Sequence, residues 1–479
     1  MSQSKKRILS LLFFSLLYIV IMAFVACGGT GIPTDTNQDT TPEDTNEVTE
    51  MATEAPTQAL TEAPTETPTE APTEAPTEPE TEPVTEAPTG EIDSDFKAMW
   101  LSQFDMKPIY TAAGGQRPEE NFRKSIAKVM QNVASWGFNT VIVQMRPNAD
   151  SFYPSEYYPP SSYVVGGYAN DFVYDPMPIV IEEAHNAGLE IHAWINPLRC
   201  MKPDEMAQVS DEYLIKQWYN LQTPAEKNTR IILNGVYLYL NPAYPEVREL
   251  IVNGALEIIK KYDVDGLHMD DYFYPTTAPA FDARAYAAYE STTNTPMSLA
   301  DWRRDNINKL VKSLYAAVKA EDPSVTFGIS PAGNITHVHG EDYADVYTWC
   351  ANEGYIDYIC PQVYFGFEHA SFPFDRVCHD WQNLIKVDSV KLVVGVTFGK
   401  AQSGSDGFAG TGKNEWSEHK DILKRCVEYT SGLEKCVGMS VFCYQYFVNP
   451  NSGLEVRATE EERANFVPVF KDITWFEEE

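Results

Sequence analysis

Basic residues are scarce in this chain, and several common functional signatures are missing from it. The 479 residues include 36 Lys and Arg against 69 Asp and Glu, which gives a formal net charge of −33 at pH 7. A chain of that sign is poorly suited to bind nucleic acid or anionic lipid, because both are themselves negative. There is also no P-loop, no dinucleotide fingerprint and no nucleophile elbow. We therefore predict no cofactor and no nucleic-acid partner.

Paired cysteines are missing too. The eight cysteines are widely spaced and include no C-x-x-C pair, so they resemble neither a disulfide framework nor a zinc site. Most of them lie in apolar surroundings such as "DYICPQ" and "SVFCYQ", which predicts small buried thiols. His337 and His339 of "HVH" lack the spacing of a zinc site, and no metal is predicted there.

Residues 1–26 have the pattern of a secretory signal. A basic start at 5–7 precedes the apolar run "ILSLLFFSLLYIVIMAF", and no later segment is long and apolar enough to span a bilayer. A small residue before Cys27, just after that run, is typical of a bacterial lipoprotein signal and predicts that Cys27 is lipidated. An uncleaved membrane anchor, or a plain signal with an incidental Cys, is the alternative.

The segment 27–95 is predicted to be a disordered linker. From about residue 32 to 94 it contains no Lys or Arg, and it repeats "TEAPTEAPTE". Regular Pro favours extended polyproline II, spaced Glu residues repel one another, and too little apolar surface is available to form a core. We expect this linker to hold the domain at 96–479 on the extracellular face of the cell membrane, in a bacterial envelope, with the lipid as its only membrane contact.

From residue 96 onward, short apolar strands alternate with amphipathic helices, the pattern of β/α units on a parallel sheet. The segment "RIILNGVYLYLNP" predicts a β-hairpin with Asn234 and Gly235 in its turn. The fold class predicted is α/β, a (β/α)8 TIM-type barrel with enlarged βα loops and this hairpin as an insertion. An open doubly wound sheet is the alternative, but the glycine-rich turn it needs after the first strand is missing. The strands are expected at 97–104, 139–147, 189–197, 264–270, 325–331, 357–365, 391–398 and 437–447.

The ends of the predicted strands carry polar and aromatic side chains, and in such barrels the site lies at those ends. Strand side chains alternate between the lumen and the helices, so the parity of each strand can be read. His192 and His268 share the lumenal parity, although a buried core histidine is the commoner outcome for either. Nine residues at the strand ends are predicted to contact substrate: Arg146, Asn148, Trp194, Asn196, His268, Tyr272, Tyr274, Gln362 and Tyr364.

The stretch "DGLHMDDYFYP" places Asp270 on the lumenal parity and Asp271 in the turn that follows. Two carboxylates within several ångström cannot both ionise easily, so one becomes an acid beside a charged neighbour. Carboxylates surrounded by aromatic rings and amides are typical of a carbohydrate cleft. A helix cap or a loop-ordering pair is the alternative interpretation.

Four ordered motifs, "VIVQMRPNADSFYPSEYYP", "EEAHNAGLEIHAWINPLR", "DGLHMDDYFYP" and "DYICPQVYF", resemble the glycosyl hydrolase-like family 10. The resemblance covers about residues 96 to 450 and implies a barrel-containing envelope protein. One Gram-negative member of that family is understood to cleave peptidoglycan glycan strands stripped of their stem peptides. The resemblance therefore implies a glycoside hydrolase with a cell-wall glycan as its substrate.

The mechanism implied is less usual, because the fifth and seventh strands end in "GISPAGNITH" and "GVTFGKAQSG" without a carboxylate. The adjacent pair is similar to the Asp-Asp pair of O-GlcNAcase-type hexosaminidases, which use the acetamido group of the substrate as nucleophile. That similarity implies Asp270 as the orienting carboxylate and Asp271 as the general acid/base, or the reverse. A second hypothesis pairs one of them with Glu368 or Asp150. A non-catalytic glycan-binding lipoprotein and a hydrolase of another extracellular polysaccharide are the alternative functions.

Overall fold

The computed structural model describes residue 92, residues 95–221 and residues 223–475. The predicted signal, the lipidation site Cys27 and nearly all of the linker lie outside the described residues. No helix within the described ranges combines the length and apolarity that a bilayer crossing requires.

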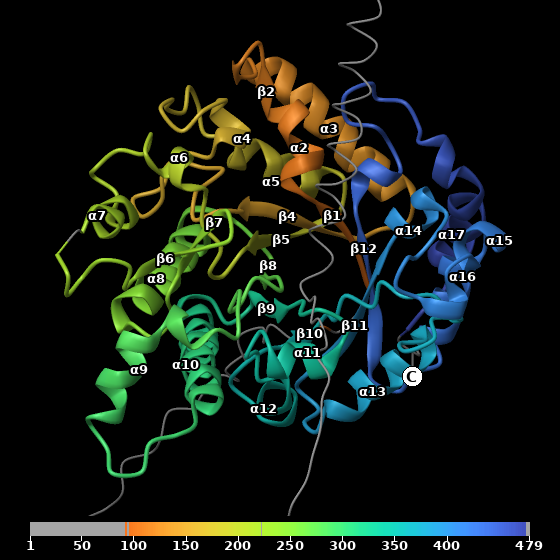
Figure 1. The fold of residues 1–479 in the computed structure, drawn as a ribbon. Helices are drawn as coiled ribbons and strands as arrows, with labels where there is room; N and C mark the ends of the chain where they lie inside the picture. Colours follow the sequence, from red (N-terminus) through yellow and green to blue (C-terminus); the bar gives the residue numbers. More distant parts are fainter. Residues whose placement is uncertain (1–91, 93–94, 222, 476–479) are drawn as a thin grey trace, which may run out of the picture. The chain divides into compact units, whose positions relative to one another are not determined.

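Eight parallel strands close into a barrel, which confirms the predicted (β/α)8 architecture (Figure 1). The first strand pairs with both the second and the last, so the sheet has no open edge. In chain order the strands are β1 (Phe96–Leu101), β4 (Thr140–Arg146), β5 (Glu190–Ile195), β8 (Gly266–Met269), β9 (Thr326–Ile329), β10 (Tyr358–Ile359), β11 (Lys391–Thr397) and β12 (Cys436–Phe442).

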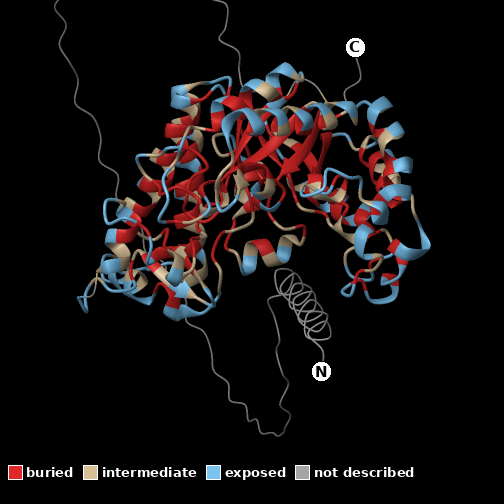
Figure 2. Cartoon of the chain, turned by 90° about the horizontal axis from the view of Figure 1, so that it is seen from above, coloured by how far each residue is buried: buried red, intermediate tan, exposed pale blue. Residues whose placement is uncertain are grey.

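A main helix follows each strand and covers the outside of the barrel. These helices are α3 (Glu119–Ser135), α5 (Met177–Asn186), α8 (Pro245–Lys261), α10 (Leu299–Glu321), α12 (Val346–Ala351), α13 (Phe374–Leu384), α16 (Ile422–Thr430) and α17 (Glu460–Asp472). In α3 the residues Phe122, Ile126, Val129 and Val133 are buried, and this spacing of three or four places one apolar stripe against the sheet. Figure 2 shows the result, with buried strands and helices exposed on their outer sides.

Shorter elements lie in the enlarged loops. The helices among them are α2 (Gln103–Tyr110), α4 (Ser162–Val165), α6 (Pro203–Met206), α7 (Leu214–Asn220), α9 (Ala283–Glu290), α11 (Ile335–Gly340), α14 (Gly399–Ser403) and α15 (Glu415–Glu418). A small hairpin joins β2 (Thr111–Ala112) to β3 (Gly115–Gln116).

The predicted hairpin insertion is confirmed as β6 (Ile231–Asn234) and β7 (Tyr237–Leu240). Gly235 in its turn has a φ of 60°, a conformation that glycine adopts without strain. The segment after β5 pairs with β7, because Leu240 N donates to Leu198 O and Cys200 N donates to Leu238 O, both at 2.8 Å. The hairpin is therefore attached to the carboxyl end of β5.

The inside of the barrel is packed with aromatic and small apolar side chains. Its members include Phe96, Trp100, Ile142, Trp194 and Tyr358, all nearly inaccessible to solvent. The lumenal parity predicted for the third and fourth strands is confirmed. The seven cysteines of the described part are buried free thiols, again as predicted.

Candidate active site at the carboxyl ends of the strands

Asp270 is the first residue after β8 and is buried, with 2% of its surface exposed. Its Oδ2 accepts a hydrogen bond from Trp194 Nε1 at 3.0 Å, and its Oδ1 accepts one from the backbone N–H of Tyr272 at 3.2 Å. Burial raises the pKa of this carboxyl well above its usual value, and the charge of Asp271 raises it further, while the two hydrogen bonds oppose the shift.

Asp271 lies in the turn beyond the strand and is only half-buried. Burial also raises its pKa, and a hydrogen bond with the side chain of Gln362 and the positive charge of Arg199 lower it. Because both pKa values are raised and the two groups repel each other, the pair tends to retain one proton. One carboxyl can then donate a proton while its neighbour carries charge.

The layer of the lumen below Asp270 is held together by Tyr358. Its hydroxyl lies 2.7 Å from Nδ1 of His268 and 2.9 Å from Nδ1 of His192. Nε2 of His268 lies 2.9 Å from Ser330 Oγ, so both ring nitrogens of His268 are engaged. Burial lowers the pKa of both histidines, that of His192 to about 4. His268 is therefore a core residue below the site, and the expectation that it contacts substrate is wrong.

The hairpin and the segment before it lie on one side of the aspartate pair and contribute residues that the sequence analysis did not single out. The guanidinium carbon of Arg199 lies 4.2 Å from the ring centre of Tyr237 and 4.6 Å from that of Tyr272. The predicted contact residue Tyr272 therefore lies beside the aspartate pair together with Arg199. The backbone of Arg199 also pairs with that of Tyr239 in β7. Burial raises the pKa of Tyr239, the charge of Arg199 lowers it, and the charge of Asp271 raises it.

The other side is formed by the loops after β9 and β10. Gln362 donates from Nε2 to the backbone O of Ser330 at 3.0 Å, and Tyr364 lies near Asp271 and packs against Phe442. Asp342 also lies here and is a further carboxyl that sequence reasoning missed. Burial and then the charge of Asp271 raise the pKa of Asp342 to about 8. Both Gln362 and Tyr364 are thus placed beside the aspartate pair, as expected.

The predicted amides Asn148 and Asn196 are buried at the end of the second and third strands. The side chain of Asn196 accepts a hydrogen bond from Gln144 Nε2 at 2.9 Å and donates one to the backbone O of Pro147 at 2.6 Å. Both of its polar atoms are therefore bonded to residues of the barrel. Oδ1 of Asn148 is buried without a hydrogen-bond partner among the described residues. Asp150, named as a second-choice catalytic residue, accepts from Asn148 N and from the Tyr168 hydroxyl, which makes it a loop-ordering group.

Two further predicted residues point elsewhere. The guanidinium of Arg146 lies over the ring of Tyr158 and beside Gly254 of α8, because the register of β4 against β5 shifts between Gln144 and Arg146 and breaks the alternation. Tyr274 is 2% exposed and packs against Phe281 and Tyr343, since the strand has ended before it. The positions of Arg146 and Tyr274 therefore do not support the substrate contacts predicted for them.

Glu368, the other second-choice catalytic residue, is exposed. Its carboxylate lies 3.7 Å from Nε2 of His419, and its backbone N–H donates to Glu415. No contact of Glu368 with the aspartate pair occurs among the described residues. The pairing hypothesis that used Glu368 is therefore not supported by its position.

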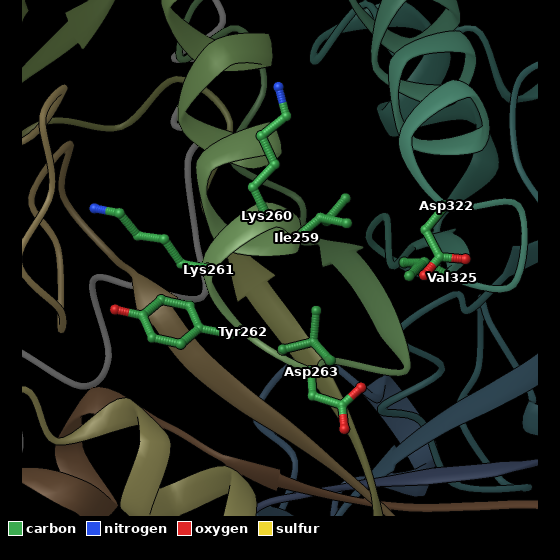
Figure 3. A pocket seen from close by; sticks show the side chains of 8 residues that line it. Ile259, Lys260, Lys261, Tyr262, Asp263, Asp322 and Val325 are labelled. Atoms are coloured by element: carbon green, nitrogen blue, oxygen red, sulfur yellow. The ribbon is translucent and has the colours of Figure 1, made fainter.

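Two pockets of the structure do not include Asp270 or Asp271 in their lining. One of about 260 Å³ sits where α8 ends and β8 begins, at the amino-terminal end of the barrel, and the charged ends of Lys260 and Lys261 point apart there (Figure 3). The other, of about 480 Å³, lies between the loop before β6 and the start of α9. Active sites of such barrels lie at the carboxyl ends of the strands, where Asp270 and Asp271 are found.

Comparison with known proteins shows which family the chain resembles. Glycosyl hydrolase YngK of Bacillus subtilis is 35% identical over 351 residues, which cover 70% of this chain and 65% of YngK. Glycosyl hydrolase DigH of Escherichia coli K12 is 27% identical over 395 residues, covering 76% of this chain and 87% of DigH. This chain thus spans slightly less than two thirds of YngK.

Among solved structures, the glycoside hydrolase domain of PgaB from Bordetella bronchiseptica aligns over 73% of this chain and 94% of that domain, with 12% identity and a TM-score of 0.48. The model of the family named Glycosyl hydrolase-like 10 matches residues 95–407. The match includes all four motifs from which the resemblance was drawn, and the relatives' names agree with the enzyme class expected. The chain belongs to the glycosyl hydrolase-like 10 family.

Proposed function

We propose that this chain is a glycoside hydrolase that cleaves glycans of N-acetylated sugars, with peptidoglycan strands that lack stem peptides as its substrate. The observation that carries the proposal is the pair Asp270 and Asp271 at one strand end, in unequal surroundings. Asp270 is held by Trp194 and by backbone, whereas Asp271 is on the more open side and next to Gln362. Unequal environments of this kind separate the roles of two carboxyls.

The reaction we propose uses the substrate's acetamido group. Its carbonyl oxygen attacks the anomeric carbon, the bond from that carbon to the leaving oxygen breaks, and Asp271 donates its proton to the leaving oxygen. Asp270 accepts a hydrogen bond from the acetamido N–H and so orients the group and stabilises the positive charge that develops on it. Water then attacks the same carbon, gives its proton to Asp271, and restores the acetamido group.

The side chains around the aspartate pair suit a sugar chain. Tyr237, Tyr272 and Tyr364 are only partly buried there, the first two with Arg199 over one ring face, and Gln362 brings an amide close to Asp271. The relatives YngK and DigH are both named glycosyl hydrolases, and the resemblance seen in the sequence motifs implies a cell-wall glycan.

The test measures release of new reducing ends from purified denuded glycan by the full chain, with mass analysis of the products. Asp271→Asn and Asp270→Asn should each lower turnover by about 100-fold or more, because each removes a group that acts in the transition state. Asp388→Asn, an exposed aspartate at the amino-terminal end of β11, is the matched control and should keep full turnover. Full turnover in both site variants would disprove the assignment. Binding of glycan with no new reducing ends would instead indicate a binding lipoprotein, and cleavage of only unrelated polysaccharides would indicate a different substrate.

We further propose that Cys27 is lipidated and that the domain works from the extracellular face of the membrane. The sequence pattern around residues 1–27 supports this. Mass analysis of the N-terminal peptide should find diacylglycerol on Cys27. Cys27→Ala should prevent that modification, and an unmodified Cys27 in the wild type would refute the anchor.

A further inference from the structure

Arg199 is a cation next to the aspartate pair, and its surroundings are unlike those of Arg303, a buried arginine that also lies over tyrosine rings. Arg303 is paired with Asp282, with Nη2 at 2.6 Å from Oδ1, and it also donates to three backbone carbonyls. Arg199 forms no ion pair with any carboxylate in the described ranges, and its Nε is buried without a hydrogen-bond partner. A buried donor without an acceptor is costly, and it is satisfied when a ligand brings one.

The side chain of Arg199 is nevertheless fixed in place. Its guanidinium lies over the rings of Tyr237 and Tyr272, and its backbone is paired with Tyr239 of β7. A guanidinium stacked on aromatic rings keeps its in-plane N–H groups available, and those groups match the two oxygens of a carboxylate. Little side-chain freedom remains to be lost when such a ligand binds.

Charge gives the second argument. The aspartate pair carries about one negative charge because it retains one proton, and burial keeps Asp342 mostly neutral below about pH 8. An anionic sugar would be repelled by the charge on the pair unless a cation met it. The charge of Arg199 acts on both Asp270 and Asp271, so this cation lies near the reacting bond.

We propose that Arg199 is a specificity-determining residue that binds a carboxylate carried by the glycan, on a sugar bound next to the bond that is cleaved. This inference rests on the proposed function and names its substrate more narrowly: an N-acetylated glycan whose sugars bear acidic substituents. The carboxylate could belong to a lactyl ether, as on muramic-type sugars, or to a uronic acid. A neutral chitin-like chain lacks the group.

The experiment compares two forms of one substrate with the full chain. Denuded glycan with its lactyl carboxylates intact is set against the same glycan with those carboxylates reduced to alcohols, and kcat/KM and equilibrium binding are measured for both. The wild type should prefer the carboxylate form by about 10- to 100-fold, the effect of one hydrogen-bonded charge pair. Arg199→Met should lose most of that preference by losing activity on the carboxylate form alone, and Arg199→Lys should fall between them. Arg284→Met, which changes an exposed arginine, should leave the preference intact.

Several results would overturn the inference. Equal activity of the wild type on both glycans would do so. An Arg199→Met variant that is slower on both glycans by the same factor would also do so, because it would mean that Arg199 acts only on the pKa values of the aspartates. A polymer of alternating N-acetylglucosamine and glucuronic acid identifies the source of the carboxylate: Arg199-dependent cleavage of this polymer alone assigns the carboxylate to a uronic acid. If no glycan is cleaved, the proposed function fails, and the binding preference with its dependence on Arg199 still decides the inference. Thermal unfolding of each variant checks that it is folded.

Discussion

The indole Nε1 of Trp194 donates a 3.0 Å hydrogen bond to Oδ2 of Asp270, and this links the ends of the neighbouring strands β5 and β8. The bond favours the ionised form of Asp270 in a position where burial and Asp271 both oppose ionisation. Trp194 is thus a group that sets the protonation of the pair as well as a packing residue.

Replacing Trp194 with Phe should therefore raise the pKa of Asp270. If the ionised form of Asp270 is required, the acid limb of the pH–rate profile should move to higher pH by about one unit, the loss of one hydrogen bond to a charged group. Trp100→Phe is the matched control, because Trp100 packs 4.6 Å from Trp194 while its buried Nε1 has no partner among the described residues. An equal shift in both variants would show that ring packing, and not the hydrogen bond, is responsible.

Asp342→Asn should change the alkaline limb of the same profile. Above about pH 8 the carboxyl of Asp342 ionises, and its charge then helps to keep the one remaining proton on the pair of Asp270 and Asp271. Without that charge the pair should lose its proton at lower pH, so the alkaline limb should move downward. Glu341→Gln, at the exposed neighbouring position, should move it less, since the charge of Glu341 raises the pKa of Asp342 less than burial and Asp271 do and is screened by solvent. Unchanged profiles in both variants would remove Asp342 from the site.

Tyr358→Phe should destabilise the barrel. The change leaves Nδ1 of His192 and Nδ1 of His268 without their buried partner, at a cost of about 2–5 kcal/mol in the free energy of unfolding. Tyr110→Phe removes a buried hydroxyl that has no partner in the described structure and should be nearly neutral. Urea unfolding at neutral pH measures both, and equal losses would contradict the role given to Tyr358.

Glu462→Gln should stabilise the protein in a pH-dependent way. Burial raises the pKa of Glu462 from 4.5 in the unfolded chain to about 7 in the folded one. Between these two pH values Glu462 ionises in the unfolded state only, so the free energy of unfolding falls as the pH rises from about 4.5 to 7 and stays lower above that. The variant should match the wild type near pH 4.5 and exceed its free energy of unfolding by about 3 kcal/mol at pH 8. Glu461→Gln, at an exposed position, should show no such pH dependence. A constant difference across the pH range would mean that Glu462 is not held neutral by burial.

The sequence predicted the barrel well because eight short apolar segments and their helices each carried a local periodic signal. It also placed Trp194 and Asp270 in the lumen, since β5 and β8 alternate without interruption. The prediction that Arg146 contacts substrate failed because the register of β4 shifts after Gln144, and no residue type in the sequence indicates that shift.

Arg199 and Asp342 could not have been found in the same way. Both lie in loops, where side chains follow no period, and both reach the site through contacts with elements distant in the sequence. The hairpin was predicted from its turn, but its role as a wall depends on the pairing of Leu198 and Cys200 with β7, which is a long-range contact.

The β6–β7 hairpin has a consequence for how such enzymes can diversify. It contributes Tyr237 and orients Arg199, yet it is an insertion between β5 and α8, whereas Asp270 and Asp271 belong to β8 and its turn. In the function proposed above, recognition and bond cleavage then belong to separately replaceable parts of the chain. Exchange of this one insertion between relatives should redirect the choice of sugar while the catalytic machinery is inherited unchanged.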